Sequence, residues 1–213
     1  MTTINIFKGA AIATVMMIAG LSLTSWDAPK PSEGQVEIGD PFPMSQHAMM
    51  NIDGSETFLR QEMKDNGLLV VFSCNTCPFV IQWENRYNEI YDMCEKNNIG
   101  MVLINSNEAK RTGDDSMVKM KEHAKAEGYK MKYLVDENHV VADAFGARTT
   151  PHVYMFDKNA MLAYRGSIDD NSENKADVQE RYLADAITAM AADKEISPNI
   201  TKSIGCSIKR VKK

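Results

Sequence analysis

The sequence predicts an α/β fold in which helices cover both faces of a mixed central sheet. Two runs of consecutive apolar residues, 68–72 and 99–105, are typical of strands that are buried on both faces, as in parallel sheets. Segments with the apolar spacing of helices separate these runs from each other and from a later pair of strands. Because parallel strands need a crossover, and crossovers are almost always right-handed, this order of elements leaves few topologies.

Three short features precede the first buried strand, and each carries a local signal. Gly and Pro mark the opening of the domain, an Asp-Gly pair marks a turn between two short strands, and a short helix follows. These features lie at 39–43, 52–55 and 57–65. After the strand at 68–72, we expect one long helix from Pro78 to about Asn97, because Pro is tolerated in a first helical turn and apolar residues recur along the segment.

The second half of the domain alternates strands and helices and contains a hairpin. After the strand at 99–105 comes a charged amphipathic helix, for which Asp114 or Asp115 is the expected N-cap. A strand, a short helix stopped by Gly146, two strands joined by a turn and a final helix complete the domain. The expected ranges, in order from the charged helix onward, are 114–127, 133–135, 140–145, 152–156, 161–164 and 175–191.

Composition limits the classes of protein that the chain can belong to. Of its 213 residues 44% are hydrophobic and 25% are charged, which suits one globular domain with an adequate core. The net charge of −5 disfavours nucleic acid or an anionic membrane as the main partner. The 15 Met are scattered and suit gap filling in the core; one cluster with soft ligands for copper is Met44, His47, Met49 and Met50. We expect no cofactor.

Residues 1–25 have the pattern of an export signal. Lys8 precedes an uncharged stretch, 9–23, which suits the core of a signal peptide but falls short of the roughly 20 apolar residues that span a bilayer. Cleavage near Ser25 and retention as an N-terminal anchor both remain open. We therefore expect a signal peptide or anchor at 1–25, a linker at 26–37 and one domain at 38–209, in the periplasm or another extracytoplasmic compartment.

Cys74-Asn75-Thr76-Cys77-Pro78 lies between the first buried strand and the long helix. The nucleophile of thiol–disulfide exchange is a thiolate, which the N–H groups and dipole at the start of a helix stabilise. A second thiol three residues later lies close enough to attack a mixed disulfide and release the partner. The spacing therefore predicts a redox dithiol, with Cys74 as the exposed, low-pKa nucleophile and Cys77 as the resolving thiol.

A lone Cys-x-x-Cys also fits other interpretations. It can be an inert structural disulfide or half of a zinc site, although Cys94, Cys206 and the four His do not repeat a zinc-ligand spacing. A copper or zinc site could instead combine the two thiols with His152. Cys94 is expected to be buried on the long helix, whereas Gly205 suggests a turn that presents Cys206 for a further disulfide.

Several segments resemble those of exported redoxin-type proteins with the thioredoxin fold, a group related to alkyl hydroperoxide reductase/thiol-specific antioxidant proteins and to thiol–disulfide oxidoreductases. The similar segments lie at 74–80, 104–107, 149–151, 164–170 and 205–209. The resemblance, which covers about residues 36–209, implies a thioredoxin-like three-layer α/β/α sandwich with a mixed central sheet. It also implies that Pro151 is cis and faces the dithiol, that Thr150 lies beside Cys74, and that both bind a partner together with Phe79.

The chain departs from that group where a proton acceptor is concerned. Thioredoxins carry a buried acidic residue on the strand before the dithiol, and 68–72 contains none. Glu84 and His152 are the candidate replacements. Both are weak ones, because a charged helix residue is usually solvated and strand alternation turns the His152 ring away from the sulfurs.

A peroxidase of the peroxiredoxin kind is the nearest alternative function. Such enzymes need Thr or Ser three residues before the reactive Cys, and Val71 and Cys74 hold those positions here, although Arg148 could approach the site. We therefore expect an exported thiol–disulfide oxidoreductase that acts on protein thiols or disulfides and on an upstream redox partner. A thiol peroxidase and a copper- or zinc-binding protein of the same fold remain the alternatives.

Overall fold

The computed structural model describes Met1 and residues 34–212. Apart from Met1, the expected signal peptide lies outside the described residues, as does most of the expected linker. The last linker residues belong to the domain, because Val36 is only 3% exposed and the Gln35 side chain donates a hydrogen bond of 2.8 Å to the Tyr154 hydroxyl. Within the described part of the chain, every helix is too short or too polar to cross a bilayer.

A mixed sheet of seven strands forms the centre of the domain, in the order β2-β1-β5-β4-β3-β7-β8. The three parallel strands are β3 (Leu68–Ser73), β4 (Gly100–Asn105) and β5 (Lys132–Val135). The remaining strands each pair antiparallel with their neighbours: β1 (Met49–Asn51), β2 (Glu56–Thr57), β7 (His152–Phe156) and β8 (Leu162–Gly166). The predicted strands and the predicted hairpin are therefore confirmed, and β3, which leads to the dithiol, lies between β4 and β7.

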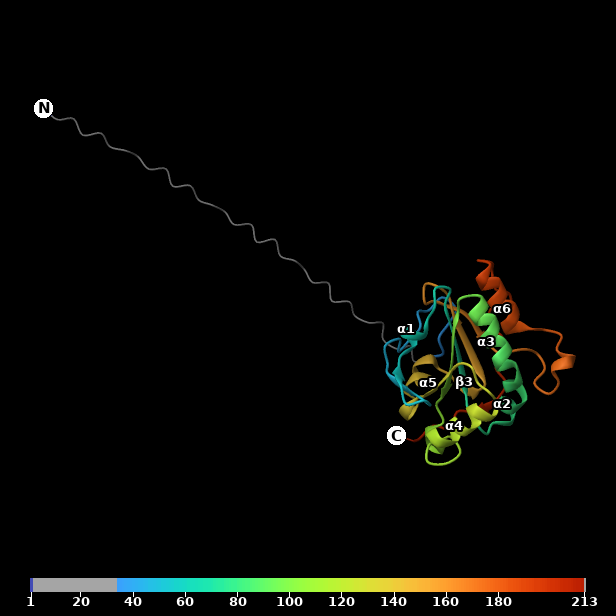
Figure 1. Ribbon diagram of the computed structural model, residues 1–213. Helices are drawn as coiled ribbons and strands as arrows, with labels where there is room; N and C mark the ends of the chain where they lie inside the picture. The colour runs from blue at the N-terminus through green and yellow to red at the C-terminus, as the bar shows by residue number, and fades with distance from the viewer. Residues whose placement is uncertain (2–33, 213) are drawn as a thin grey trace. The chain divides into compact units, whose positions relative to one another are not determined.

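Alternate residues of β3 face opposite layers of the domain. Leu69 and Val71 pack in a core with residues of three helices, α3 (Tyr87–Lys96), α4 (Met117–Ala126) and α6 (Tyr182–Ala191). Leu68, Val70 and Phe72 pack in a second core with residues of α1 (Leu59–Glu62) and α5 (Val140–Phe145). Figure 1 shows α3 and α6 on one side of β3 and α1 and α5 on the other. The predicted thioredoxin-like three-layer α/β/α sandwich is confirmed.

The long helix predicted for 78–97 is interrupted by a 3₁₀ turn. Helix α2 (Pro78–Trp83) ends at this turn, Glu84–Arg86, and α3 begins directly after it. The interruption is anchored by Asp169, which accepts a hydrogen bond of 2.6 Å from Trp83 Nε1 and pairs with Arg86 at 3.1 Å. All three side chains are buried, so this contact from a distant loop fixes the direction of α2, the helix that follows the dithiol.

Other predicted boundaries also change where side chains offer a competing contact. Helix α1 spans four residues, because Phe58 before it and Met63 after it are extended. Helix α4 is capped by Ser116, whose Oγ accepts a hydrogen bond from the Lys119 N–H, and not by Asp114 or Asp115. The final helix begins at Tyr182, and a separate 3₁₀ turn occupies Lys175–Asp177.

A second sheet of two short strands was not predicted. Strand β6 (Thr149–Thr150) pairs antiparallel with β9 (Cys206–Ser207), near the C-terminal end of the chain. Two-residue strands carry no readable periodicity, which explains why the sequence does not reveal them. This pairing brings the C-terminal segment to the residues just before Pro151.

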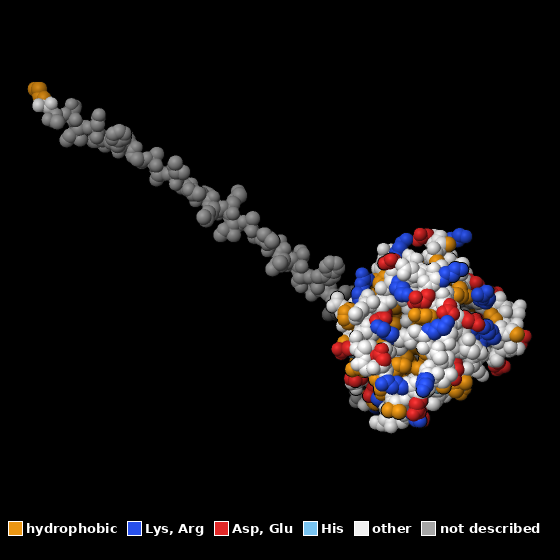
Figure 2. All heavy atoms as spheres, viewed as in Figure 1, with side chains coloured by type: hydrophobic (Ala, Val, Ile, Leu, Met, Phe, Trp, Pro, Cys, Tyr) orange, Lys and Arg blue, Asp and Glu red, His pale blue; other side chains and the backbone are white. Residues whose placement is uncertain are grey.

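Charged side chains of both signs are interspersed over the face of the domain in Figure 2, without a large area of one sign. Many of them form exposed ion pairs, such as Lys130 with Asp92 and Lys158 with Asp193. Exposed pairs of this kind add little stability. Their mixture leaves no basic stripe on this face that would suit a nucleic-acid backbone.

Candidate active site

The dithiol loop connects the C-terminal end of β3 to α2. Cys74 follows the last residue of β3, while Cys77 is the N-cap residue of α2 and Pro78 is the first helical residue. Both sulfurs are free thiols, and both residues are nearly buried, with exposed fractions of 2% and 4%. The start of the helix therefore lies at the second cysteine of the pair.

Thr150 contacts both thiols of the loop. Its Oγ1 lies 3.3 Å from Cys74 Sγ, which confirms the expected position of Thr150 beside Cys74. Its carbonyl oxygen accepts a hydrogen bond of 3.2 Å from Cys77 Sγ when that thiol is protonated. The Thr150–Pro151 peptide bond is cis, also as expected. One residue thus presents a hydroxyl to the first sulfur and a carbonyl to the second.

Cys206 brings a third sulfur to the same place. The pairing of β9 with β6 sets Cys206 opposite Thr150. Cys206 is half-buried and, together with Phe79, packs against a cluster formed by Cys74, Cys77 and Val80. We call Cys74, Cys77 and Cys206 the thiol cluster. The expectation that Cys206 lies near the surface is confirmed, and its neighbours are the dithiol itself.

The pKa values of the two loop thiols shift in opposite directions. The pKa of Cys77 is lowered to about 4, because Cys74 donates a hydrogen bond to its sulfur, with further donors in the Cys206 thiol and the backbone N–H groups of Val80 and Cys206. The pKa of Cys74 is raised, because its proton is held in the bond to Cys77 and because it is buried and faces the Asp115 carboxylate.

The structure corrects the expectation that Cys74 is an exposed sulfur, because Cys74 is only 2% exposed. The helix begins at Pro78, as expected, so its first free backbone N–H groups lie beside Cys77. The directions of the two pKa shifts favour a thiolate at Cys77 next to a protonated thiol at Cys74.

A buried carboxylate beside the dithiol is the main residue that the sequence did not reveal. Asp115 Oδ1 accepts hydrogen bonds from the Asn75 backbone N–H at 3.0 Å and from Asn105 Nδ2 at 2.7 Å, and Oδ2 accepts one of 3.0 Å from Asn107 Nδ2. The sequence held a weak signal for this burial: Asp114, Asp115 and Ser116 are all possible N-caps of α4, and only one of them can take that position. Ser116 takes that position, which leaves Asp115 for the interior.

Glu84 is buried, contrary to the expectation of a solvated helix residue. Its Oε2 accepts a hydrogen bond of 2.7 Å from the Tyr129 hydroxyl and pairs with His123 Nε2 at 2.7 Å. That partnership raises the pKa of His123. The contacts of Glu84 thus lie between the 3₁₀ turn and α4, and its role there is to join these elements.

His152 lies on the α5 side of the sheet, with its ring against Tyr154 at a centroid distance of 4.6 Å. Its Nε2 is 3.1 Å from Gln35 Nε2, and its pKa is lowered to about 3 by burial and by the charges of Arg165 and Arg148. As strand alternation predicted, the ring faces residues other than the sulfurs. Arg148 itself is exposed and lines a surface hollow with Gln35, Asp143 and Arg210.

The ligand set of the copper or zinc hypothesis does not come together. His152 faces Tyr154, away from Cys74 and Cys77, so the three residues cannot share one ion. Within Met1 and residues 34–212, no group of three or more His, Cys, Asp or Glu side chains is arranged to hold a metal ion. Cys94 is buried as expected, and burial raises its pKa to about 12.

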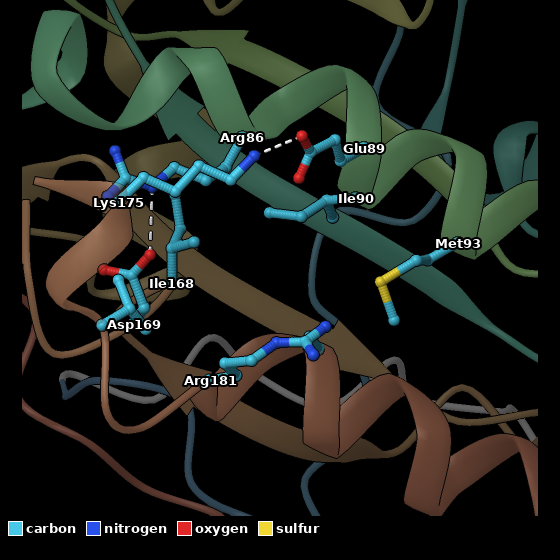
Figure 3. Close-up of a pocket in the computed structure, with 10 residues that line it drawn as sticks. Arg86, Glu89, Ile90, Met93, Ile168, Asp169, Lys175 and Arg181 are labelled. Atoms are coloured by element: carbon cyan, nitrogen blue, oxygen red, sulfur yellow. Dashed lines mark hydrogen bonds and ion pairs between the residues drawn. The ribbon is translucent and has the colours of Figure 1, made fainter.

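A cavity of about 170 Å³ opens between α3 and α6 (Figure 3). Ile90, Met93 and Ile168 supply its apolar lining. Ion pairs of Arg86 with Asp169 and of Lys175 with Glu89 lie at its edge (Figure 3). Because no residue of the thiol cluster lines it, this cavity is a separate feature of the domain.

Comparisons with known proteins agree with the fold. The model of the Redoxin family matches residues 37–181. The crystal structure of an uncharacterized conserved protein from Geobacillus kaustophilus is 32% identical, covers 82% of this chain and 93% of that one, and gives a TM-score of 0.76. None of the curated proteins matches the chain.

Two more distant structures share the fold but have different described activities. Peroxidoxin BcpB from Mycobacterium tuberculosis is 14% identical, covers 73% of this chain and 98% of its own, and gives a TM-score of 0.57. A proposed thiol:disulfide interchange protein, DsbE from Chlorobium tepidum, is 14% identical, covers 74% of this chain and 99% of its own, and gives a TM-score of 0.59. At such identities the likeness concerns the fold alone.

Proposed function

The chain belongs to the Redoxin family, and on that premise we propose that it is a thiol–disulfide oxidoreductase that acts through Cys74 and Cys77. One observation carries the proposal: the thiols of Cys74 and Cys77, three residues apart at the start of α2, both contact Thr150. The pKa of Cys77 is lowered and that of Cys74 is raised, which supports it. A thiolate beside a protonated thiol is the starting state that two-step exchange requires.

In the reductive direction, the Cys77 thiolate attacks one sulfur of a partner disulfide. A Cys77–partner bond forms, the partner S–S bond breaks, and the other partner sulfur leaves as a thiolate and takes up a proton. Cys74 then loses its proton and attacks Cys77 Sγ, which releases the second partner thiolate and leaves a Cys74–Cys77 disulfide. The partner gains two electrons and the dithiol loses them; the reverse steps oxidise a partner dithiol.

The surroundings of the loop support a protein as the partner. A surface hollow of about 340 Å³ adjoins Asn75 and Thr76, with His123 on its α4 side. Phe79, half-buried beside the sulfurs, offers an apolar contact, and Thr150, the residue before Pro151, contacts both thiols. We therefore assign Thr150, Pro151 and Phe79 to partner binding, and an upstream redox protein to the recycling of the dithiol.

Export of the chain is part of this proposal and depends on residues 1–25. The uncharged stretch 9–23 after Lys8 supports a signal peptide or an N-terminal anchor. In an oxidising compartment the dithiol would remain oxidised unless a dedicated reductant acted on it. Fractionation of cells that express the full chain, with the mass of the recovered protein, tests export and cleavage together.

Trapping of mixed disulfides tests the proposed chemistry. The double variant C74S/C206S leaves Cys77 alone in the cluster, and C77S/C206S leaves Cys74 alone. With a labelled disulfide-containing peptide, C74S/C206S should accumulate several-fold more mixed disulfide, because Cys77 carries the thiolate. More trapping on C77S/C206S would reverse the two roles. No trapping on either variant, with no reduction of the peptide by the wild-type protein, would refute the function.

A further inference from the structure

Cys77 is the central member of the thiol cluster, since it interacts with both other thiols. It shares one packed cluster with Cys74, and Cys206 packs against that cluster. Cys206 also pairs with Thr150, whose carbonyl accepts a hydrogen bond from Cys77. The Cys206 sulfur in turn faces the backbone N–H of Phe79. Three sulfurs from two segments about 130 residues apart in the sequence thus meet at the start of α2.

A glycine allows this approach of the C-terminal segment. A Cβ atom at Gly205 would lie 2.2 Å from the Thr150 carbonyl oxygen, closer than real Cβ contacts come. The same oxygen accepts the hydrogen bond from Cys77. Any larger residue at 205 would push β9 away from β6, so the glycine keeps Cys206 in contact with the dithiol.

The segment after β9 is also held firmly. Ile208 is buried in the core on the α5 side, and its N–H donates a hydrogen bond of 3.0 Å to the Arg148 carbonyl. The Lys209 N–H donates to Asn107 Oδ1 at 2.8 Å, and Asn107 in turn binds Asp115. The hydrogen-bond network beside the dithiol loop therefore also positions Cys206.

We propose that Cys206 is a third redox-active thiol of this site and forms an alternative disulfide with Cys77, with β9 in the place of a partner peptide. The proposal rests on the function proposed above. Starting from the Cys74–Cys77 disulfide, the Cys206 thiolate attacks Cys77 Sγ; the Cys77–Cys206 bond forms and the Cys74–Cys77 bond breaks. Cys74 leaves as a thiolate and takes up the proton that Cys206 lost. One disulfide replaces another, so no external oxidant or reductant is needed.

Cys206 can attack a mixed disulfide between Cys77 and a partner in the same way. The partner thiolate leaves, and the Cys77–Cys206 disulfide remains. Cys74 and Cys206 therefore compete to release the partner, because both lie against Cys77. A chain without Cys74 keeps one route of release through Cys206.

The experiment uses the variant C74S, oxidised with glutathione disulfide and then alkylated to block free thiols. Trypsin separates Cys77, on peptide 65–86, from Cys206, on peptide 203–209. We expect mass spectrometry to find these two peptides joined as the main product. The matched variant C77S keeps Cys74 and Cys206 and should give several-fold less of the joined peptides, and buried Cys94, on peptide 87–96, serves as the internal reference. Two free thiols in oxidised C74S, or bonds between molecules only, would overturn the proposal.

A second variant tests the geometry and leaves both thiols in place. In the C74S protein, Gly205→Ala should lower the yield of the Cys77–Cys206 disulfide several-fold, because the new methyl group displaces β9. An unchanged yield would contradict the argument. If the wild-type protein reduces no protein disulfide while C74S still joins the two peptides, the proposed function fails, and the Cys77–Cys206 disulfide stands without a role in exchange. If the wild-type protein exchanges disulfides but C74S joins nothing, the inference alone fails.

Discussion

The backbone N–H of Asn75 donates a hydrogen bond of 3.0 Å to the carboxylate of Asp115. This bond ties the dithiol loop to the segment before α4, and side chains at the end of β4 satisfy the remaining lone pairs of the carboxylate. The charge is fully buried, so it acts on its surroundings through little screening. Asp115 therefore both shapes the loop and opposes ionisation of Cys74.

We expect Asp115→Asn to lower the pKa of Cys74. The test compares C77S with C77S/D115N, in which Cys74 is the loop thiol that titrates, by thiolate absorbance as a function of pH. The variant should also lose about 1–3 kcal/mol of stability in urea unfolding, because the amide cannot accept all three hydrogen bonds. Asp114→Asn removes the same charge from the exposed neighbouring residue and serves as the control. A Cys74 pKa that stays constant or rises would contradict this role.

The stability of the reduced protein should rise with pH because of Cys77. Its pKa is about 4 in the folded state, against an ordinary value of 9.0, so between these values the unfolded chain binds more protons. The stabilisation is complete above the ordinary value and is lost as the pH falls toward 4. Urea unfolding in strong reductant at about pH 5 and about pH 8 should show that Cys77→Ser costs more stability at the higher pH. An equal loss of stability at the two pH values would mean that Cys77 is not the thiolate.

His152 should make the protein sensitive to acid. Its pKa is about 3 in the folded state and 6.5 ordinarily, so below 6.5 the unfolded chain takes up a proton that the folded state excludes. Stability from this source is present above 6.5 and is lost as the pH falls toward 3. With His152→Gln, the stability should fall less steeply as the pH is lowered from 6.5 toward 3, and disulfide exchange should remain intact. The same substitution at His47 is the control, and an unchanged decline in His152→Gln would contradict the assignment.

Peroxide should be a poor substrate. Val71 and Cys74 occupy the positions where a peroxidase needs a hydroxyl, and Arg148 lines a hollow with Gln35 and Asp143 instead of facing the sulfurs. In a coupled assay of peroxide consumption, we expect a rate typical of an unassisted protein thiol. Rapid turnover that is lost in C77S or C74S would favour the peroxidase instead.

The sequence predicted the elements that depend on local patterns. The apolar run at 68–72 became the central strand β3, and Gly146 ends α5 with a positive φ of 63°. The resemblance placed Thr150 beside Cys74, as the structure confirms.

What the sequence did not reveal depends on contacts between distant residues. The break after Trp83 has neither Gly nor Pro as a signal, because Asp169, more than 80 residues away, holds the turn. Asp115 looked like a helix cap because Asp is a preferred N-cap residue, and the sequence gives no sign of the buried amides that bind it instead. Gly205 indicated that Cys206 is presented, but only the register of β9 with β6 shows that its neighbour is Cys77.

The pairing of β9 with β6 has a consequence for the newly made protein. A chain is synthesised from its N-terminus, so the sheet and its helices can assemble before residue 206 exists. During that interval Cys74 and Cys77 lack their contact with Cys206. Synthesis of residues 206–207 ends this interval, because β9 can then pair with β6 and place Cys206 against the dithiol.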